Sequence, residues 1–165
     1  MYRGTGTVAA AARADLAFLA VPWSAAVATV EELREALDMK VLVDLTNPMN
    51  ATYDGLVTDD STSGSETLAR AAGGRVRLVA ALKNTFAGTF AEPTISGGPA
   101  PDVLVAGDDS DGKKQVMELI AAMGFGALDA GPLATARTIE RMTLLLVHLA
   151  NANHWNWNAG WKLLH

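Results

Sequence analysis

Cysteine is absent from this chain of 165 residues, which excludes disulfide bonds, thiolate metal ligands and a cysteine nucleophile. Positive charge is scarce, because 13 Lys and Arg residues face 18 Asp and Glu residues and leave a formal net charge of −5. Nucleic acids and anionic membranes are bound by concentrated positive charge, so neither is an expected partner. Long apolar runs are also missing: none approaches the roughly 20 residues of a membrane span, and Met1-Tyr2-Arg3 leads into no signal-peptide core. We therefore expect a cytoplasmic location.

Hydrophobic side chains are abundant, at 50% of the residues, whereas only 19% of the residues are charged. This balance is typical of a folded chain rather than a disordered one. The length suits one domain and is short for two, and the Gly/Pro-rich stretch 96–101 is too short to separate domains. We expect residues 1–165 to form a single domain.

Short apolar runs alternate with longer segments of helical periodicity. The expected strands are 16–21, 41–46, 76–82, 103–106 and 127–130. The expected helices are 24–37 after a Ser24 cap, a helix that begins at the Ser63–Glu66 capping box, 113–123 and 138–152. Buried strands that alternate with helices predict a layered α/β fold with a mostly parallel sheet.

One glycine motif is a misleading signal. Residues 4–9, Gly-Thr-Gly-Thr-Val-Ala, satisfy the dinucleotide-binding pattern G-x-G-x-x-[GA]. That pattern works only after a buried strand, which aims the turn and the next helix at the pyrophosphate. Only three residues precede it here, so we predict a turn before a short Ala-rich helix.

Five later segments carry a resemblance that covers essentially the whole chain. They are ADLAFLAVPW at 14–23, VDLTNP at 43–48, VAALKNTFA at 79–87, VLVAGDD at 103–109 and LDAGPL at 128–133. In order and spacing they resemble the coenzyme F420-dependent NADP reductase family. Members of that family begin with a strand, the Gly-rich turn, a helix and a second strand, and these parts have no counterpart here. The resemblance thus implies an incomplete Rossmann-like parallel sheet flanked by helices, with a C-terminal helical segment.

The same resemblance implies hydride-transfer chemistry on a small molecule, with NADP or F420 as cofactor. The phosphate cradle of the family lies in the part without a counterpart, so we predict that this chain binds NADP(H) weakly or not at all. Two alternatives stay open. One is a cofactor-independent enzyme, such as a cyclase or isomerase of an apolar metabolite, and the other is a non-catalytic binding or assembly module.

Four residues are candidates for cofactor contacts. Ligands of open α/β sheets lie beyond the carboxyl ends of the strands, and Pro22-Trp23 and Asn47-Pro48 directly follow the first two expected strands. By resemblance, the first pair borders the nicotinamide and its ribose, and the Asn47 amide could bond ribose or substrate. A strand terminator with a packing tryptophan and an ordinary turn are the structural alternatives.

Lys83, Asn84, Thr85 and Phe86 follow the third expected strand and are candidates for substrate binding. By resemblance they lie beside the nicotinamide and the reducible ring. Three consecutive polar side chains offer a cation and several hydrogen-bonding groups, which is more than a loop requires. We therefore favour a functional role for this segment.

Two further segments complete the substrate candidates. Gly131, Pro132 and Leu133 resemble the mouth of the family's substrate pocket, although Gly-Pro is also common in turns. Trp155 and Trp157 belong to a tail rich in Trp and Asn, which could form the roof of a pocket. A dimer interface or a cap on the core is the alternative for this tail.

The acidic run at Asp108, Asp109 and Asp111 could suggest a cation, but it precedes an expected helix, so we interpret it as helix capping. No histidine pair has metal-ligand spacing, and we expect no metal site. We also expect a homodimer, because strand 16–21 carries no charge or bulge to protect an open edge before Pro22. Pairing through this edge, or through helix 138–152 and the Trp tail, would cover it.

Overall fold

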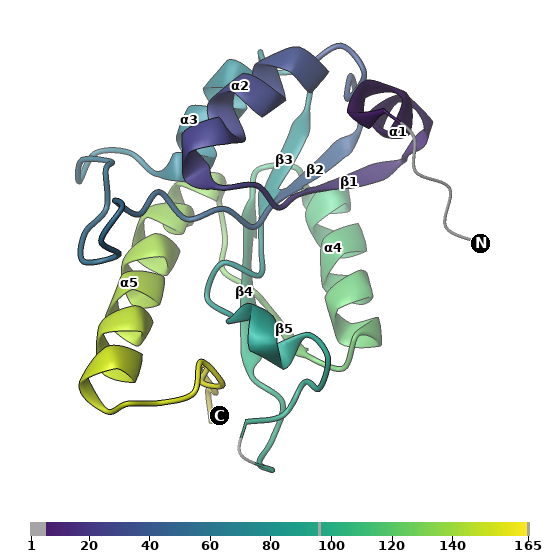
Figure 1. Cartoon of the computed structure of the whole chain (residues 1–165). Coiled ribbons are helices and arrows are strands. Elements are labelled where there is room, and N and C mark those ends of the chain that lie inside the picture. The colour runs from purple at the N-terminus through teal and green to yellow at the C-terminus, as the bar shows by residue number, and fades with distance from the viewer. Residues whose placement is uncertain (1–5, 96, 165) are drawn as a thin grey trace.

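The computed structural model describes residues 6–95 and 97–164. Its centre is a five-stranded sheet in the order β1-β2-β3-β4-β5 (Figure 1). The strands are β1 (Leu16–Leu19), β2 (Val41–Asp44), β3 (Arg77–Ala80), β4 (Asp102–Gly107) and β5 (Gly126–Asp129). All five lie where the apolar runs predicted them, so the expected α/β fold with a mostly parallel sheet is confirmed.

One strand pair departs from the parallel pattern. β1, β2 and β3 are parallel, and so are β4 and β5, but β3 and β4 are antiparallel. For the next strand to run parallel, a crossover segment must return the chain to the end of the sheet where the preceding strand began. Between β3 and β4, the described residues 81–95 and 97–101 contain one regular element, the short 3₁₀ helix η1 (Ala87–Thr89), and the chain turns back beside β3.

Helices cover both faces of the sheet. They are α1 (Thr7–Arg13), α2 (Trp23–Leu33), α3 (Gly64–Ala71), α4 (Ser110–Ala122) and α5 (Ala136–Ala152). Leu42 of β2 packs in a core with α2, α3 and the first turns of α5, whereas Val41 and Val43 pack in a second core with α4. Successive side chains of a strand point to opposite faces, so two covered faces require the continuous apolar runs seen in the sequence.

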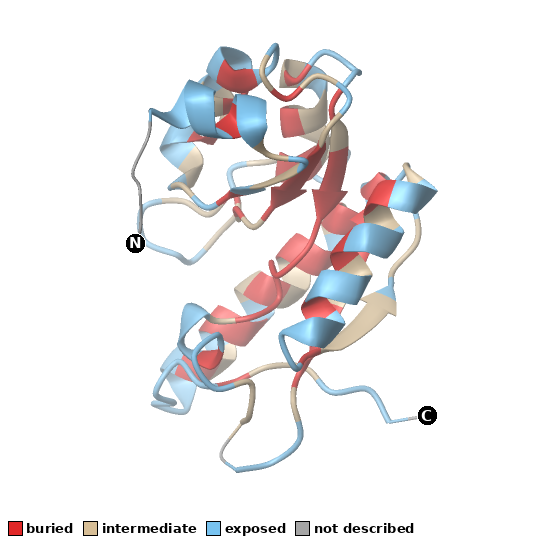
Figure 2. Ribbon diagram, turned by 90° about the vertical axis from the view of Figure 1, so that its right-hand side faces the viewer, coloured by how far each residue is buried: buried red, intermediate tan, exposed pale blue. Residues whose placement is uncertain are grey.

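Burial is deepest in the middle of the sheet. Figure 2 shows β2, β3 and β4 as largely buried, whereas β1 and β5 are only partly covered. Within the described residues, β1 pairs only with β2, and Phe18 at its centre is 45% exposed. None of the helices in 6–95 and 97–164 is long and apolar enough to cross a membrane.

Two helix starts follow the expected capping signals. Ser63 Oγ accepts a hydrogen bond from the Glu66 amide at 3.0 Å, and Ser63 N–H donates to the Glu66 carboxylate at 2.8 Å. Asp109 Oδ1 accepts from the Gly112 amide at 2.6 Å, so the acidic run caps α4 as predicted. The Ser24 cap is wrong, because α2 begins one residue earlier, at Trp23, with Pro22 before it and no side-chain cap.

The glycine motif is followed by α1, the short Ala-rich helix that was expected. Gly4 and Thr5 lie outside the described residues. Lys40 holds the end of α1 by donating hydrogen bonds to the carbonyls of Ala11 and Ala12, at 2.8 and 2.6 Å.

Candidate functional site

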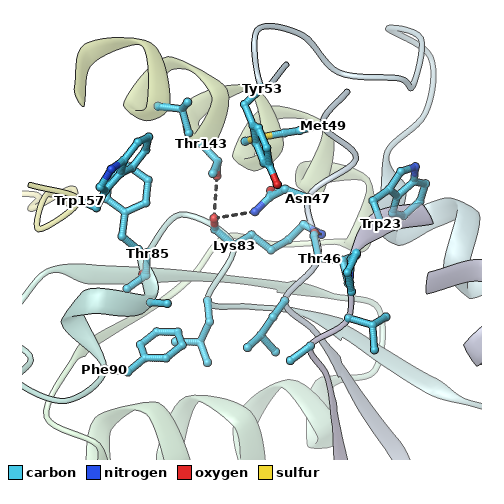
Figure 3. A pocket seen from close by; sticks show the side chains of 18 of the residues that line it. Trp23, Thr46, Asn47, Met49, Tyr53, Lys83, Thr85, Phe90, Thr143 and Trp157 are labelled. Carbon is cyan, nitrogen blue, oxygen red and sulfur yellow. Dashed lines mark hydrogen bonds between the residues drawn. The ribbon is translucent and has the colours of Figure 1, made fainter. Parts of the chain in front are cut away.

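A cavity of about 670 Å³ lies beyond the carboxyl ends of β1, β2 and β3 (Figure 3). The segment after each of these strands contributes one wall, α5 contributes another, and the tail after α5 supplies Trp157. This is the edge at which open α/β sheets bind their ligands. The volume is in the usual range for small-molecule sites.

Large apolar side chains form most of the lining. Aromatic rings come from every wall except α5: Trp23, Tyr53, Phe86, Phe90 and Trp157. The rings of Phe86 and Trp157 meet edge to face with centroids 5.2 Å apart, so the Trp-rich tail contacts the loop after β3. Flat apolar walls of this kind suit a planar ring.

Two polar atoms at the cavity lack hydrogen-bond partners. Asn47 Oδ1 and Thr85 Oγ1 are buried and unpartnered, and they are two of four such side-chain atoms among the residues that the structure describes. Leaving a buried polar group unpaired costs roughly 1–3 kcal/mol, so such groups call for an explanation such as a ligand. Both residues line the cavity, which makes it the leading candidate for a binding site.

Backbone strain is concentrated around the same cavity. Leu82, Tyr53 and Trp157 have φ angles of 58°, 58° and 54°, and all three residues line the cavity. Across the described residues only two other non-glycine positions, Met39 and His154, have positive φ. Strained backbone persists where the surrounding structure over-determines it, often at functional sites.

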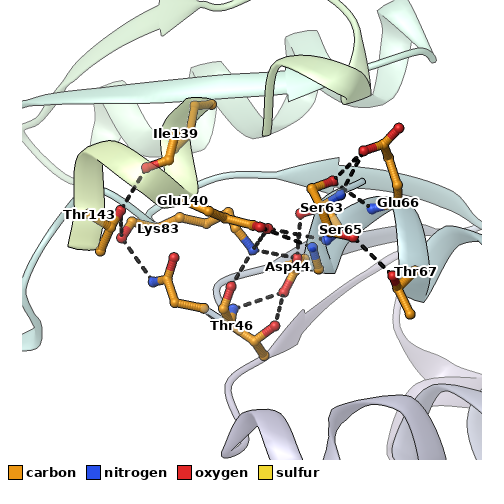
Figure 4. A network of polar contacts seen from close by, with 12 residues as sticks. Asp44, Thr46, Ser63, Ser65, Glu66, Thr67, Lys83, Ile139, Glu140 and Thr143 are labelled. Carbon is orange, nitrogen blue, oxygen red and sulfur yellow. Dashed lines mark hydrogen bonds and ion pairs between the residues drawn. The ribbon is translucent and has the colours of Figure 1, made fainter. Parts of the chain in front are cut away.

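Lys83 lines the cavity, but its charge is directed elsewhere. Its ammonium is fully buried and pairs with Asp44 at 2.7 Å and Glu140 at 3.2 Å (Figure 4). Ser65 Oγ also donates to Asp44, at 2.6 Å, and the amides of Gly64 and Ser65 donate to Glu140. The cation that the sequence suggested for a substrate is therefore neutralised inside the protein.

Beside this network, Glu66 links α3 to α5. Arg137 Nε donates to Glu66 Oε2 at 2.8 Å. This guanidinium contact holds the pKa of the Glu66 carboxyl below its ordinary value, with Ser63 adding hydrogen bonds in the same direction. The charged carboxylate of Glu66 thus takes part both in the capping box with Ser63 and in an ion pair with Arg137.

Seven of the residues suggested by the sequence line the cavity: Pro22, Trp23, Asn47, Lys83, Thr85, Phe86 and Trp157. Pro48 is buried next to the cavity residues but does not line it. Asn84 does not reach the cavity either. It is fully buried, its Nδ2 donates to the Asp102 carbonyl at 2.8 Å, and its Oδ1 accepts from the Leu104 amide at 3.2 Å.

The remaining suggested residues also lie outside this cavity. Gly131 and Pro132 form the turn after β5, where Gly131 N–H donates to Asp129 at 2.8 Å. Leu133 is buried in the core, and its amide donates to Asp108 at 2.9 Å. Trp155 is 44% exposed and lines a separate pocket, so only one of the two suggested tail tryptophans reaches the cavity.

Sequence reasoning missed the two buried carboxylates, Asp44 and Glu140. A signal existed for each of them. Asp44 interrupts an apolar run in a buried strand, and Glu140 sits on the apolar side of a long helix beside Ile139. A charge at such a position is rarely buried unless it is paired.

Comparison with known proteins adds a family to this geometry. Residues 3–48 match the family model described as NADP oxidoreductase coenzyme F420-dependent. The F420-dependent NADP reductase of Methanothermobacter marburgensis is 34% identical over 168 residues, which cover 98% of this chain and 73% of that protein.

Solved structures agree in fold. A protein of Arthrobacter sp. FB24, assigned as an F420-dependent NADP reductase, superposes with a TM-score of 0.88 at 25% identity over 96% of this chain and 72% of that one. Pyrroline carboxylate reductase of Plasmodium falciparum, solved with NADP bound, gives a TM-score of 0.55 at 13% identity, covering 91% and 50% of the two chains. The latter likeness concerns the fold alone.

Proposed function

The chain belongs to the F420-dependent NADP reductase family, and from this premise we propose that its cavity binds the ring of F420, or the nicotinamide ring of NADP(H), for hydride transfer involving a small molecule. The observation that carries the proposal is the pair of unpartnered atoms, Asn47 Oδ1 and Thr85 Oγ1, in an otherwise apolar and aromatic cavity. A heteroaromatic ring with polar groups on its rim matches both features.

The residues present fit such a ring. Trp23, Phe86 and Trp157 offer flat apolar surface, the Asn47 oxygen can accept a hydrogen bond, and the Thr85 hydroxyl can donate or accept one. When bound, the cofactor ring supplies or accepts the hydride. The aromatic walls exclude water from the reacting ring, which protects a hydride from side reactions with solvent.

The ionisable side chains favour hydride transfer over acid–base chemistry. Among the described lining residues only Lys83 and Tyr53 are ionisable, and the Lys83 ammonium is held in buried ion pairs. A cofactor-independent isomerase or cyclase needs a positioned acid or base at its substrate. The transfer of a hydride from ring to ring needs no acid or base at the two carbon atoms that exchange it.

Weak NADP(H) binding remains part of the proposal. The described lining residues include no unpaired cation that could hold a phosphate. The phosphate-bearing part of either cofactor would then lie outside this cavity, and the affinity would come from the ring. We therefore expect F420 to bind the chain more tightly than NADP(H), because its larger ring covers more of the apolar wall.

The test is a titration of the full chain with F420, in which binding is measured by the change in the protein's intrinsic fluorescence. A parallel titration uses NADPH. We expect saturable F420 binding that weakens about tenfold in Thr85→Val, which keeps the shape of the side chain and removes the hydroxyl. Thr29→Val on α2 is the matched control and should bind as the parent does. Absence of F420 and NADPH binding would overturn the proposal and favour a cofactor-independent role.

A further inference from the structure

We propose that Lys83 is a positioning residue whose buried ion pairs fix its own carbonyl, so that Asn47 presents its amide oxygen rather than its amide nitrogen to the cavity. The inference rests on the proposed function in one respect, namely that the cavity binds a cofactor ring. Lys83 itself contacts no ligand in this scheme. Its influence reaches the cavity through one hydrogen bond.

The ammonium end of Lys83 is enclosed by oxygen atoms of three residues from two parts of the chain. It pairs with Asp44 at the end of β2 and Glu140 of α5, and it donates to the carbonyl of Thr46 (Figure 4). Each of the two ion-pair distances is 3.2 Å or less, and all three charged side chains are fully or almost fully buried. Nothing in this arrangement leaves the ammonium free to meet a ligand.

The oxygen atoms around the ammonium are themselves held in place. Asp44 accepts from the Thr46 amide at 2.8 Å and from the Thr46 hydroxyl at 2.7 Å. Glu140 accepts from the first two amides of α3, those of Gly64 and Ser65, at 3.0 and 3.2 Å. Because both carboxylates are fixed, the position of the Lys83 side chain is fixed as well, and removing it would leave two buried carboxylates without their cation.

The backbone of Lys83 faces the cavity side. The preceding residue, Leu82, has a φ of 58°, which turns the chain sharply at the start of the segment that follows β3. The Lys83 carbonyl then accepts two hydrogen bonds, from Thr143 Oγ1 at 2.9 Å and from Asn47 Nδ2 at 3.1 Å (Figure 3). One residue thus binds the buried carboxylates with its side chain and the cavity residues with its carbonyl.

This carbonyl decides the orientation of the Asn47 amide. A carbonyl oxygen can only accept, so Asn47 must turn its NH₂ group toward Lys83. The other end of the amide, Oδ1, is left buried and unpartnered. A ligand that reaches this buried oxygen must therefore bring a hydrogen-bond donor, such as an N–H on its ring or on a ring carboxamide, and an otherwise similar ligand without a donor would leave Oδ1 unpaired.

A ligand-free experiment tests the positioning role directly. The side-chain amide signals of Asn47, assigned by their loss in Asn47→Ala, are followed by NMR in the parent and in Lys83→Met. We expect at least a tenfold faster hydrogen exchange of this NH₂ group in folded Lys83→Met. Lys113→Met is the matched control, because it removes another largely buried lysine, on α4, which is paired with Asp129 at 2.7 Å and does not line the cavity.

Should Lys83→Met fail to fold, Glu140→Gln provides the second variant. It keeps the ion pair between Lys83 and Asp44, whose net charge is zero, and removes only the negative charge of Glu140. We expect a several-fold rise in the exchange rate of the Asn47 amide. Unchanged exchange in a folded variant of either kind would overturn the proposal.

Binding supplies a second readout that a purely structural role would not reproduce. We expect Lys83→Met and Asn47→Ala each to weaken F420 binding about tenfold, and the double variant to be no weaker than the weaker single variant. Fully multiplying losses would contradict coupling through the Lys83 carbonyl. If the parent chain binds no F420, the proposed function fails, and the NMR arm still decides the role of Lys83.

Discussion

Asn84 and Thr85 are neighbours in the chain, yet their side chains have different surroundings. Thr85 leaves its hydroxyl unpartnered at the cavity, whereas Asn84 turns inward and bridges the loop after β3 to β4. A polar residue at the end of a strand can therefore serve either the ligand site or the protein itself. Its number of satisfied hydrogen bonds distinguishes the two roles.

Asn84→Ala should consequently affect stability rather than binding. The change removes the side-chain hydrogen bonds to the Asp102 carbonyl and to the Leu104 amide, so we expect the free energy of unfolding to fall by about 2–3 kcal/mol. F420 affinity should change by less than about threefold, below the tenfold loss expected for removing one ligand hydrogen bond. Chemical denaturation and fluorescence titration of the same preparation check both values. A large loss of affinity in a folded variant would place Asn84 at the ligand after all.

At the scale of elements, α3 brings two electrostatic contacts to its first turn. Its capping box uses Glu66, and the same carboxylate receives Arg137 from α5. The helix end is thus stabilised by its own residues and by a distant helix. Negative charge near a helix N-terminus is favourable in itself, so the three effects have the same sign.

The stability contributed by Glu66 should depend on pH. Because Arg137 lowers the pKa of Glu66 in the folded chain, the contribution is fully present above the ordinary value of 4.5 and is lost as the pH falls through the lowered folded value. We expect Glu66→Gln to lower the unfolding free energy by about 1 kcal/mol at pH 7. Urea melts of both proteins between pH 7 and pH 3 should show this difference shrinking toward zero.

Glu31→Gln is the control for this series, since it removes the same charge from an exposed position on α2. It should cause no comparable loss at pH 7. A difference between the parent and Glu66→Gln that stays constant down to pH 3 would show that the carboxylate charge is not what stabilises α3.

Apolar runs and capping signals were sufficient to predict most of the elements. Val41-Leu42-Val43 is buried on both sides because helices cover both faces, and a continuous apolar run is what such a strand requires. The antiparallel direction of β4 could not be predicted, because it depends on how residues 81–101 return across the sheet. The Ser24 cap failed because Pro22, with its fixed φ, already provides the extended residue before the helix.

The sequence predicted the location of the candidate site better than it predicted which polar side chains are available to a ligand there. The segments after three strands converge, as expected for parallel strands, so Trp23, Asn47 and Thr85 meet at one cavity. The fate of the Lys83 charge depends on Glu140, 57 positions later in the chain, and sequence spacing alone does not reveal such a partner. Whether a side chain points toward the cavity or toward the core is decided by its tertiary contacts.

For the whole molecule, the edge of the sheet at β1 is the feature from which we predict association. Within the described residues β1 pairs on one side only, and Phe18 exposes nearly half of its surface there. An exposed strand edge is a template for pairing with another chain, and a symmetric pair would cover the edge and the apolar surface beside it.

We therefore predict a homodimer at micromolar concentration, with a mass of about twice 17.3 kDa in sedimentation or light scattering. Phe18→Lys places a charge on the edge and should shift the protein toward monomer. Val57→Lys, at a residue that is 57% exposed and lies outside both β1 and the cavity lining, is the control for added charge. A monodisperse 17.3 kDa species in the parent would contradict the prediction.

The contact between Phe86 and Trp157 also means that the cavity is completed by a residue that follows α5 in the chain. The walls after β1, β2 and β3 and the wall from α5 all precede Asn153 in the chain, and Trp157 is the last lining residue that the ribosome adds. A nascent chain that has reached the end of α5 already contains the whole sheet but lacks one aromatic wall. The complete cavity therefore depends on a tail residue outside the sheet and the helices, so its last aromatic wall can be lost without the loss of any strand.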